Sequence, residues 1–459
     1  MADGSGYDIV ILGGGSGGYA CALRAAELGK RVALIEKGKV GGTCLHRGCI
    51  PTKALLHAAE IADLARESGS FGIRASLDGI DMPGVNAYKD KVVTRLWKGL
   101  QGLIKSRQID VIEGEGRLVS PTQVQVGETV YEGAHIVLAT GSEARSLPGL
   151  AIDGERVITS DQALVLDRVP SAVVILGGGV IGVEFASVWR SFGAEVTIVE
   201  MLPHLLPPEE ESSSKLLERA FRRRGITQKL GARFESVKDT GSGVTVTLEG
   251  GATIDAELLL VAVGRGPVSA GLGYEEAGVK VERGFVLVDG YCRTNVPTIS
   301  AVGDLTPGPQ LAHVGFAEGI AVAERLAGLD VTPIDYDGVP RVTYSDPEVA
   351  SVGITSAIAA ERGIETTEFT YDLAGNGKSQ ILQTQGAAKI IAAAGGGPVL
   401  GVHLVGARVG ELIAEGQLIY NWEATPSDVA QLIHPHPTQS EALGEAHLAL
   451  AGKPLRVHA

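Results

Sequence analysis

The sequence predicts an α/β fold in which a strand–glycine loop–helix–strand unit occurs twice and a C-terminal α+β domain follows. Three observations support this fold class. A glycine-rich segment that begins at Gly13 recurs without a gap from Gly177, and each copy follows a short apolar strand and leads into a helical pattern. From about Tyr336 onward, short apolar strands alternate with helical stretches and no glycine fingerprint recurs. The 459 residues are also too many for one hydrophobic core, so several domains are expected.

Both copies carry the G-x-G-x-x-G pattern of a dinucleotide-binding loop. A lone match is weak, but each loop here has a strand before it, a helix after it and an acidic residue ending the next strand. The first glycine allows the tight turn, the second lets the backbone approach a pyrophosphate, and the third permits close helix–strand packing. Two complete copies argue against glycine turns without a ligand. The matched residues are Gly13, Gly15, Gly18 and Glu36 in the first copy, and Gly177, Gly179, Gly182 and Glu200 in the second.

The acidic residues predict which nucleotides bind. Glu36 and Glu200 can each hydrogen-bond a ribose hydroxyl pair. A carboxylate at Glu200 would repel a 2′-phosphate, and no arginine follows it in VEMLPHLL. The second site is therefore expected to prefer NAD over NADP.

The segment GGTCLHRGCIPTK places Cys44 and Cys49 just after the first fingerprint. In a regular helix, residues five apart have Cα atoms roughly 8.6 Å apart, whereas a disulfide needs about 4.4–6.8 Å. A bridge would thus require a distorted backbone, which Gly48 favours, and a strained bridge is easily reduced. The alternatives are two unrelated buried thiols or half of a metal site, for which the nearby histidines are His46 and His57. We favour a redox pair without a metal, and we assign FAD to the first fingerprint and NAD to the second.

Two further glycine segments, HIVLATGS and LLLVAVGRGP, follow apolar strands and resemble strands that end at domain crossovers. Asp304, in TISAVGDL, could reach a flavin ribityl hydroxyl or could simply cap a helix.

The stretch from Ala172 to Trp189 is the most membrane-like, but its glycine triplet and Glu184 favour a strand–turn–helix. The predicted domains are 1–146 for FAD, 147–266 for NAD, 267–335 as a central domain completing the FAD site, and 336–459 as an interface domain.

Composition narrows the class of protein. The net charge of −14 argues against nucleic acid as the main partner. Four cysteines, of which Cys21 and Cys292 are the others, do not make a secreted disulfide scaffold. The N-terminus lacks the pattern of a signal peptide, so a cytoplasmic location is expected.

The C-terminal segment IHPHPTQSEALGEA contains a candidate acid–base pair. His436 could remove a thiol proton near neutral pH, and Glu441 could orient it. The alternative is an exposed turn with incidental histidines, since short motifs give many false positives. We interpret His434 as supporting structure and give His313 no catalytic role.

Taken together, these motifs resemble the two-cysteine flavoprotein disulfide reductases, and among them most the dihydrolipoamide dehydrogenases. The resemblance spans nearly the whole chain, with the motifs in the family's order. The matching segments are GGGSGGY, GGTCLHRGCIPTKAL, LATGS, GGGVIGVEFAS, AVGRGP, AVGD, LAH and HPHPTQSEAL.

The resemblance implies a homodimer that uses FAD and NAD to oxidise dihydrolipoamide on a lipoyl-bearing acyltransferase subunit of a 2-oxo acid dehydrogenase complex, or on a glycine cleavage carrier protein. It makes Cys44 the interchange thiol, Cys49 the thiol nearer the flavin, and His436 with Glu441 the acid–base pair serving the other subunit. Lys53 and Glu184 would pair beside the isoalloxazine. Further FAD contacts are implied for Gly42, Thr43, Lys53, Gly116, Thr140, Gly141, Asp304 and Ala312, and Gly264 would lie near NAD.

The chain departs from the family at His46–Arg47, where asparagine and valine are more common, and at Val314, where many members have lysine. Arg47 could favour the thiolate or point to solvent.

A reductase of another disulfide, such as mycothione or glutathione, is an alternative function, although Glu200 disfavours the NADP typical of glutathione reductases. Mercuric reductase relatives carry a C-terminal cysteine pair that this chain lacks. Tyr19 leans toward the dihydrolipoamide enzymes, and the intact catalytic set argues against a non-catalytic flavoprotein.

Overall fold

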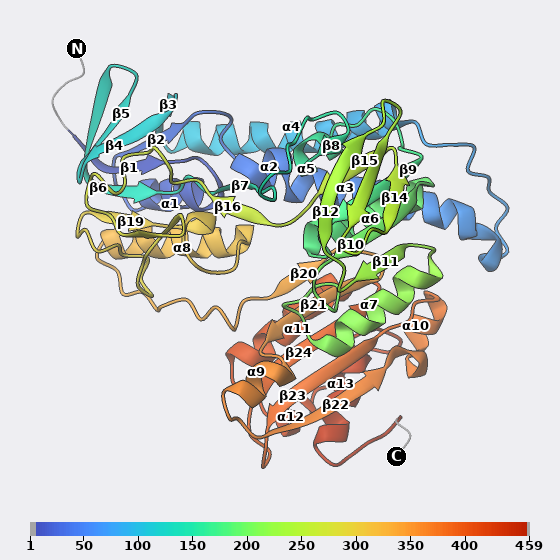
Figure 1. Ribbon diagram of the computed structural model, residues 1–459. Helices are drawn as coiled ribbons and strands as arrows, with labels where there is room; N and C mark the ends of the chain where they lie inside the picture. Colours follow the sequence, from blue (N-terminus) through green and yellow to red (C-terminus); the bar gives the residue numbers. More distant parts are fainter. Residues whose placement is uncertain (1–5, 457–459) are drawn as a thin grey trace. The chain divides into compact units, whose positions relative to one another are not determined.

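The computed structural model describes residues 6–456, which form two compact units. One unit combines the described residues up to Ala54 with Pro83–Arg145 and Gly264–Tyr336. The other combines Leu55–Met82, Ser146–Val263 and the described residues from Asp337 onward. Each unit is described separately below (Figure 1).

The first unit is built on a seven-stranded sheet of order β3-β2-β1-β6-β5-β4, in which β19 also pairs with β6. Strands β3, β2, β1, β6 and β19 are parallel, whereas β5 and β4 extend the sheet antiparallel. Strand β6 is long enough to pair with β5 at its start and with β1 and β19 at its end. The bounds are β1 Tyr7–Leu12, β2 Val32–Glu36, β3 Asp110–Glu113, β4 Gly116–Ser120, β5 Gln123–Val126, β6 Thr129–Leu138 and β19 Ile299–Ala301.

Helices α1 and α8 lie side by side in this unit (Figure 1). Glycine permits the close approach, because a Cβ on Gly319 would lie 2.3 Å from the carbonyl oxygen of Gly17. The helices are α1 Ser16–Glu27, α2 Gly42–Arg47, α4 Met82–Ser106, α8 Ala312–Leu326 and the start of α3 Cys49–Glu67, with the 3-10 turn η2 Gly303–Leu305. Two short antiparallel pairs complete the unit, β7 Ser142–Ala144 with β16 Arg265–Pro267, and β17 Val281–Glu282 with β18 Phe285–Val286.

The second unit contains a five-stranded parallel sheet of order β11-β10-β9-β15-β8. The second fingerprint forms the predicted strand–turn–helix, since β9 leads through the glycine loop into α6. A three-stranded antiparallel sheet, β12-β13-β14, follows along the chain. The bounds are β8 Val157–Ile158, β9 Ala172–Leu176, β10 Glu195–Glu200, β11 Thr227–Leu230, β12 Phe234–Asp239, β13 Val244–Leu248, β14 Thr253–Ala256, β15 Leu258–Val261, α5 Ser160–Ala163, α6 Val180–Phe192 and α7 Glu211–Arg223; 3-10 turn η1 is Ser68–Phe71.

The C-terminal part of this unit is an antiparallel sheet of order β20-β21-β24-β23-β22 packed with helices. Its core includes Val352, Ile390, Val402 and Leu443, all almost fully buried. The bounds are β20 Arg341–Thr343, β21 Glu348–Gly353, β22 Thr366–Asp372, β23 Ala387–Ala393, β24 Val399–Gly406, α9 Ser356–Glu361, α10 Gly377–Ile381, α11 Val409–Asn421, α12 Pro426–Val429 and α13 Glu441–Leu450, with 3-10 turn η3 Leu373–Gly375.

These elements confirm the predicted α/β class with a C-terminal α+β domain. The stretch from Ala172 to Trp189 is the strand–turn–helix expected from its glycines. Within residues 6–456, no helix has the length and apolar character needed to cross a bilayer. Over the same residues, no group of His, Cys, Asp and Glu side chains is arranged to hold a metal ion.

Candidate active site

The outer glycines of both fingerprints are required by packing against the protein itself. Gly13 has φ +109°, and a Cβ there would lie 2.2 Å from the carbonyl oxygen of Ala139. A Cβ on Gly18 would lie 1.9 Å from the carbonyl oxygen of Gly13. The second loop repeats this geometry, with distances of 2.3 Å for Gly177 and 2.0 Å for Gly182.

The middle glycines have a different explanation. A Cβ on Gly15 or on Gly179 would meet no atom of the described chain within 4 Å. Both residues have extended backbones at the N-termini of α1 and α6, and neither helix has a side-chain cap. The first amide groups of each helix are therefore available to an anion, which is what a dinucleotide pyrophosphate needs.

The two fingerprint carboxylates are fixed in the same way in both copies. The Glu36 carboxylate accepts hydrogen bonds from the backbone amides of Gly14, at 2.7 Å, and Gly38, at 2.8 Å. The Glu200 carboxylate accepts from Gly178, at 2.7 Å, and Leu202, at 2.8 Å. Each carboxylate oxygen keeps a second lone pair, so the predicted ribose contacts remain chemically available.

The cysteine segment docks directly on the first fingerprint. The amide of Gly41 donates to the carbonyl of Gly14 at 2.8 Å. A Cβ on Gly42, which has φ +58°, would lie 2.6 Å from the Cα of Gly15. Glycines at 41 and 42 therefore bring the start of α2 against the loop that is expected to hold FAD.

The predicted distortion between the cysteines is present. Helix α2 ends at Arg47, Gly48 leaves the helical conformation with φ −146° and ψ −111°, and α3 begins at Cys49. A Cβ on Gly48 would lie 3.1 Å from the carbonyl oxygen of Thr43, so this close approach favours glycine. Cys44 and Cys49 lie close enough for a hydrogen bond between their side chains, and the Cys44–Cys49 disulfide stays a prediction.

Neighbouring groups control the reactivity of the pair. The hydrogen bond with Cys49 raises the pKa of the Cys44 thiol, as do burial and charge on Cys49, while the nearby Lys53 ammonium opposes them. The charge of Asp304 adds a smaller increase to the pKa of Cys44. Burial raises the pKa of Tyr19 to about 12, and the two cysteines add to the shift, so the phenol stays neutral beside them.

Asp304 belongs to a polar network that sequence reasoning missed. The hydroxyl of Ser142 donates to Asp304 at 2.5 Å and accepts from the guanidinium of Arg265 at 2.8 Å. Arg265 also donates to the carbonyl of Ser142 at 2.6 Å, and it lies 3.5 Å from the hydroxyl of Thr43. The signal was available, since Ser142 and Arg265 lie in the LATGS and AVGRGP motifs.

The loop that carries Asp304 is held from behind by the fully buried carboxylate of Glu318. Glu318 accepts from the amide of Gly303 at 2.5 Å and from the hydroxyl of Tyr336 at 2.6 Å. Burial raises the pKa of Glu318 despite these two hydrogen bonds. Nothing in the local sequence distinguished this glutamate from an exposed helix residue.

Other residues that the resemblance assigned to FAD or NAD have clear local roles, and their ligand contacts stay predictions. Thr140 donates to the carbonyl of Val268 at 2.6 Å, and Gly116 packs so closely that a Cβ would lie 2.5 Å from Leu12. Gly141 and Gly264 have positive φ values of 69° and 104°. Ala312 starts α8, which has no side-chain cap.

The charged residues next to the cysteines, His46 and Arg47, have different surroundings. The imidazole Nε2 of His46 lies 3.0 Å from the carbonyl of Val40, and the ring meets the edge of Trp97. Arg47 is exposed.

Glu184 is buried and accepts from the amide of Tyr344 at 2.9 Å. The pairing of Glu184 with Lys53 stays a prediction, because the two residues belong to different units.

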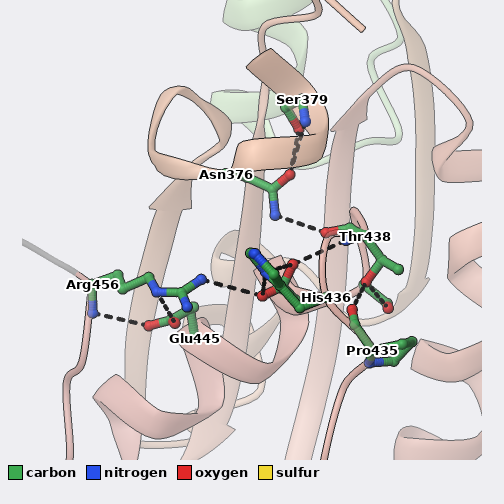
Figure 2. Close-up of polar contacts among 9 residues, drawn as sticks. Asn376, Ser379, Pro435, His436, Thr438, Glu445 and Arg456 are labelled. Carbon is green, nitrogen blue, oxygen red and sulfur yellow. Dashed lines mark hydrogen bonds and ion pairs between the residues drawn. The ribbon is translucent and has the colours of Figure 1, made fainter. Parts of the chain in front are cut away.

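The predicted acid–base pair is formed in the C-terminal domain (Figure 2). The Nδ1 atom of the exposed His436 lies 2.9 and 3.1 Å from the two carboxylate oxygens of Glu441. The amide of Thr438 donates to the same carboxylate at 2.9 Å. Burial alone would raise the pKa of Glu441, but the hydrogen bonds from Thr438, His436 and Arg456 outweigh it and lower this pKa. Asn376 holds the loop by donating to the carbonyl of Thr438 at 2.9 Å.

His434 forms a second pair, as supporting structure should. Its Nε2 lies 2.7 Å from Glu415, and this hydrogen bond raises the pKa of His434. A Cβ on Gly444 would lie 2.6 Å from the His434 ring, so the ring packs directly on α13. His313 is exposed at the start of α8.

Comparison with known proteins places this arrangement in a family. Residues 7–319 match the family described as pyridine nucleotide-disulphide oxidoreductase, and residues 339–447 match its dimerisation domain. The mitochondrial dihydrolipoyl dehydrogenase of Pisum sativum is 40% identical, over 98% of this chain and 92% of the relative. The dihydrolipoyl dehydrogenase of Bacillus subtilis (strain 168) is 40% identical, over 97% of this chain and 98% of the relative. The crystal structure of LpdA from Mycobacterium tuberculosis superposes on this protein with a TM-score of 0.90. The two sequences are 29% identical, and the match covers 96% of this chain and 99% of that chain.

The chain therefore belongs to the pyridine nucleotide-disulphide oxidoreductases. This confirms the predicted family, the oxidoreductase class and the use of FAD and NAD(H) as cofactors. The chain also carries the family's dimerisation domain.

Proposed function

We propose that this protein is a homodimeric flavoenzyme that oxidises dihydrolipoamide to lipoamide with NAD⁺. The observation that carries the proposal is the pair of hydrogen-bonded thiols at the Gly48 helix break, packed against the first fingerprint. Relatives named dihydrolipoyl dehydrogenase match the chain over nearly its full length, which supports this substrate.

The described residues fit FAD at the first fingerprint and NAD at the second. Gly15 and Gly179 leave their helix N-termini open to a pyrophosphate, and Glu36 and Glu200 hold carboxylates at the ribose positions. The buried carboxylate of Glu200 is fixed by two backbone amides at the ribose position, and it offers no cationic partner there to a 2′-phosphate, which supports NAD over NADP.

The thiol chemistry follows from the residues present. His436 takes a proton from one thiol of dihydrolipoamide, and the thiolate attacks Cys44 of the oxidised pair, which breaks the Cys44–Cys49 bond and frees Cys49 as a thiolate. The second substrate thiol then attacks the substrate sulfur of the mixed disulfide, which breaks that sulfur's bond to Cys44 and passes the thiol proton to the departing Cys44. Lipoamide leaves, and the cysteine pair keeps both electrons. The chemistry supplied by bound FAD is transfer of this electron pair to NAD⁺ as a hydride.

The acid–base role of His436 is supported by its orientation. Hydrogen bonding between Nδ1 and Glu441 leaves Nε2 as the proton acceptor and stabilises the imidazolium that forms. In the dimer, we propose that His436 of one subunit serves the cysteine pair of the other. A lipoyl-bearing acyltransferase subunit or a glycine cleavage carrier protein would deliver the substrate, and the cytoplasm is the proposed location.

A substrate comparison tests the proposal. We expect NAD⁺-dependent oxidation of dihydrolipoamide to exceed the NADH-driven reduction of mycothione or glutathione disulfide by about 10²-fold or more in kcat/KM, as site-specific recognition allows. Preference for either alternative disulfide would refute the assignment. Anaerobic dithiol should also produce a red-shifted charge-transfer band in the flavin spectrum.

A histidine variant tests the base. His436→Gln should slow dihydrolipoamide oxidation by about 10²–10⁴-fold and leave NADH–dye activity intact, because only the first reaction needs a proton acceptor. His57→Gln is a matched control, since His57 is also exposed and its Nδ1 lies 3.0 Å from Glu60. Equal losses of both activities in His436→Gln would count against this role.

A further inference from the structure

The C-terminal tail turns back along α13 and brings a positive charge to the acid–base pair. Gly452 has φ +73°, and the amide of Lys453 donates to the carbonyl of Leu448 at 2.8 Å, so the chain reverses at the end of the helix. The reversal places Arg456 beside the first turn of α13, where Glu441 lies.

Arg456 contacts the same carboxylate oxygen as His436 (Figure 2). A guanidinium nitrogen of Arg456 lies 3.2 Å from Oε1 of Glu441, and this oxygen lies 2.9 Å from Nδ1 of His436. The backbone amide of Arg456 also donates to Glu445 at 3.1 Å. One guanidinium and one imidazole therefore share a single carboxylate.

Burial makes this contact different from an ordinary surface ion pair. The side chains of Glu441 and Glu445 are only 11% and 7% exposed, and they lie one helical turn apart, where two carboxylates repel each other. Arg456 lies beside both, at 3.2 Å from Glu441 and 3.9 Å from Glu445. The guanidinium therefore lies beside two nearly buried carboxylates, although half of the arginine side chain is exposed.

The other charged and titratable groups around the pair are accounted for. Burial raises the pKa of Tyr371, which faces Glu441, Glu445, Arg456 and Asp372, so its phenol is neutral near physiological pH. On the other side, His434 is paired with Glu415 and interacts with Glu441. Neither group offers a fixed positive charge like the guanidinium, which remains protonated at every working pH.

We propose that Arg456 is a positioning residue of the acid–base site, which shares the Glu441 carboxylate with His436 and so keeps the imidazole unprotonated down to a lower pH. The guanidinium of Arg456 neutralises part of the negative charge of Glu441, so less of that charge stabilises the His436 imidazolium. Glu441 thereby orients the imidazole while its carboxylate is shared between His436 and Arg456. This role rests on the function proposed above for His436.

The proposal is tested by measuring how kcat/KM for dihydrolipoamide depends on pH in the Arg456→Met variant. We expect the acidic limb of its kcat/KM profile for dihydrolipoamide to move up by about half a pH unit, as for an exposed ion pair, so that activity near pH 6 falls about threefold. NADH–dye activity should not change. Arg456→Lys keeps the charge and should move the limb less.

Arg362→Met is the matched control. Arg362 is 48% exposed, against 50% for Arg456, and it forms an ion pair at 2.6 Å with Asp337, a more exposed carboxylate outside the acid–base site. Its profile should match that of the wild type. Thermal unfolding of all variants separates an effect on the base from loss of the fold.

A titration without substrate separates this proposal from the proposed function. NMR of the full-length flavoprotein with labelled histidine, assigned with His436→Gln, should show the His436 signal titrating at higher pH in Arg456→Met. That shift would support the proposal even if dihydrolipoamide were not the substrate. An unchanged or lowered titration midpoint in folded Arg456→Met would overturn it.

Discussion

Replacing the middle glycine of the second fingerprint separates cofactor binding from folding. In Gly179→Ala, the new methyl group meets no described atom within 4 Å, and the backbone values of φ −77° and ψ −175° suit alanine. We therefore expect the free energy of unfolding to change by less than about 1 kcal/mol.

The same methyl group should interfere strongly with NADH. It lies at the N-terminus of α6, where the uncapped amides would face the pyrophosphate of a bound NADH. Loss of one or two hydrogen bonds to a charged group costs about 1.5–3 kcal/mol each, which corresponds to an increase in KM for NADH of at least about tenfold.

NADH–ferricyanide kinetics and thermal unfolding measure the two effects, and Gly182→Ala is the control. A Cβ on Gly182 would lie 2.0 Å from a backbone oxygen, so this variant should lose stability, by about 1–3 kcal/mol or more. A folded Gly179→Ala enzyme with the wild-type KM for NADH would refute the assignment of the second loop.

Three further predictions concern other residues. Cys44→Ser should abolish dihydrolipoamide turnover and leave FAD bound, as measured by assay and flavin absorbance; loss of FAD or retained turnover would contradict the role of Cys44. Glu200→Gln should reduce the NAD/NADP preference by about tenfold, because a neutral side chain no longer repels the 2′-phosphate; an unchanged kcat/KM ratio would exclude the ribose contact. Burial lowers the pKa of His447 from 6.5 to about 4. The unfolded state therefore binds the extra proton first, and stability should fall as the pH decreases from 6.5 towards 4, by up to about 1.4 kcal/mol per pH unit. Denaturant unfolding of His447→Gln should show a smaller slope over this window, and an equal slope would show that His447 does not contribute.

The local sequence was sufficient to predict the parts of the site that are formed by residues close together in the chain. The spacing of Gly13 and Gly18 predicted a loop that admits no side chain, and the structure places both against backbone oxygens. The distance argument for Cys44 and Cys49 required a distorted backbone for a bridge between them, and the helix is broken at Gly48, while the bridge itself stays a prediction. His436 and Glu441 are close in sequence, and their hydrogen bond was predictable once the family resemblance was seen.

The remaining parts of the site depend on contacts between distant segments. Ser142, Arg265 and Asp304 come from three separate parts of the chain. They meet because β7 pairs with β16 and the turn that carries Asp304 packs against β16. Glu318 became recognisable only when the packing of α8 buried it behind Gly303.

The fold class, the two nucleotide loops, the cysteine pair and the histidine–glutamate pair could thus be predicted from the residues alone. The polar side chains that hold these groups in place, including Arg456 beside Glu441, could be identified only from the folded chain. Backbone sterics and short-range spacing are encoded locally, whereas burial and charge pairing depend on which distant segments the fold brings together.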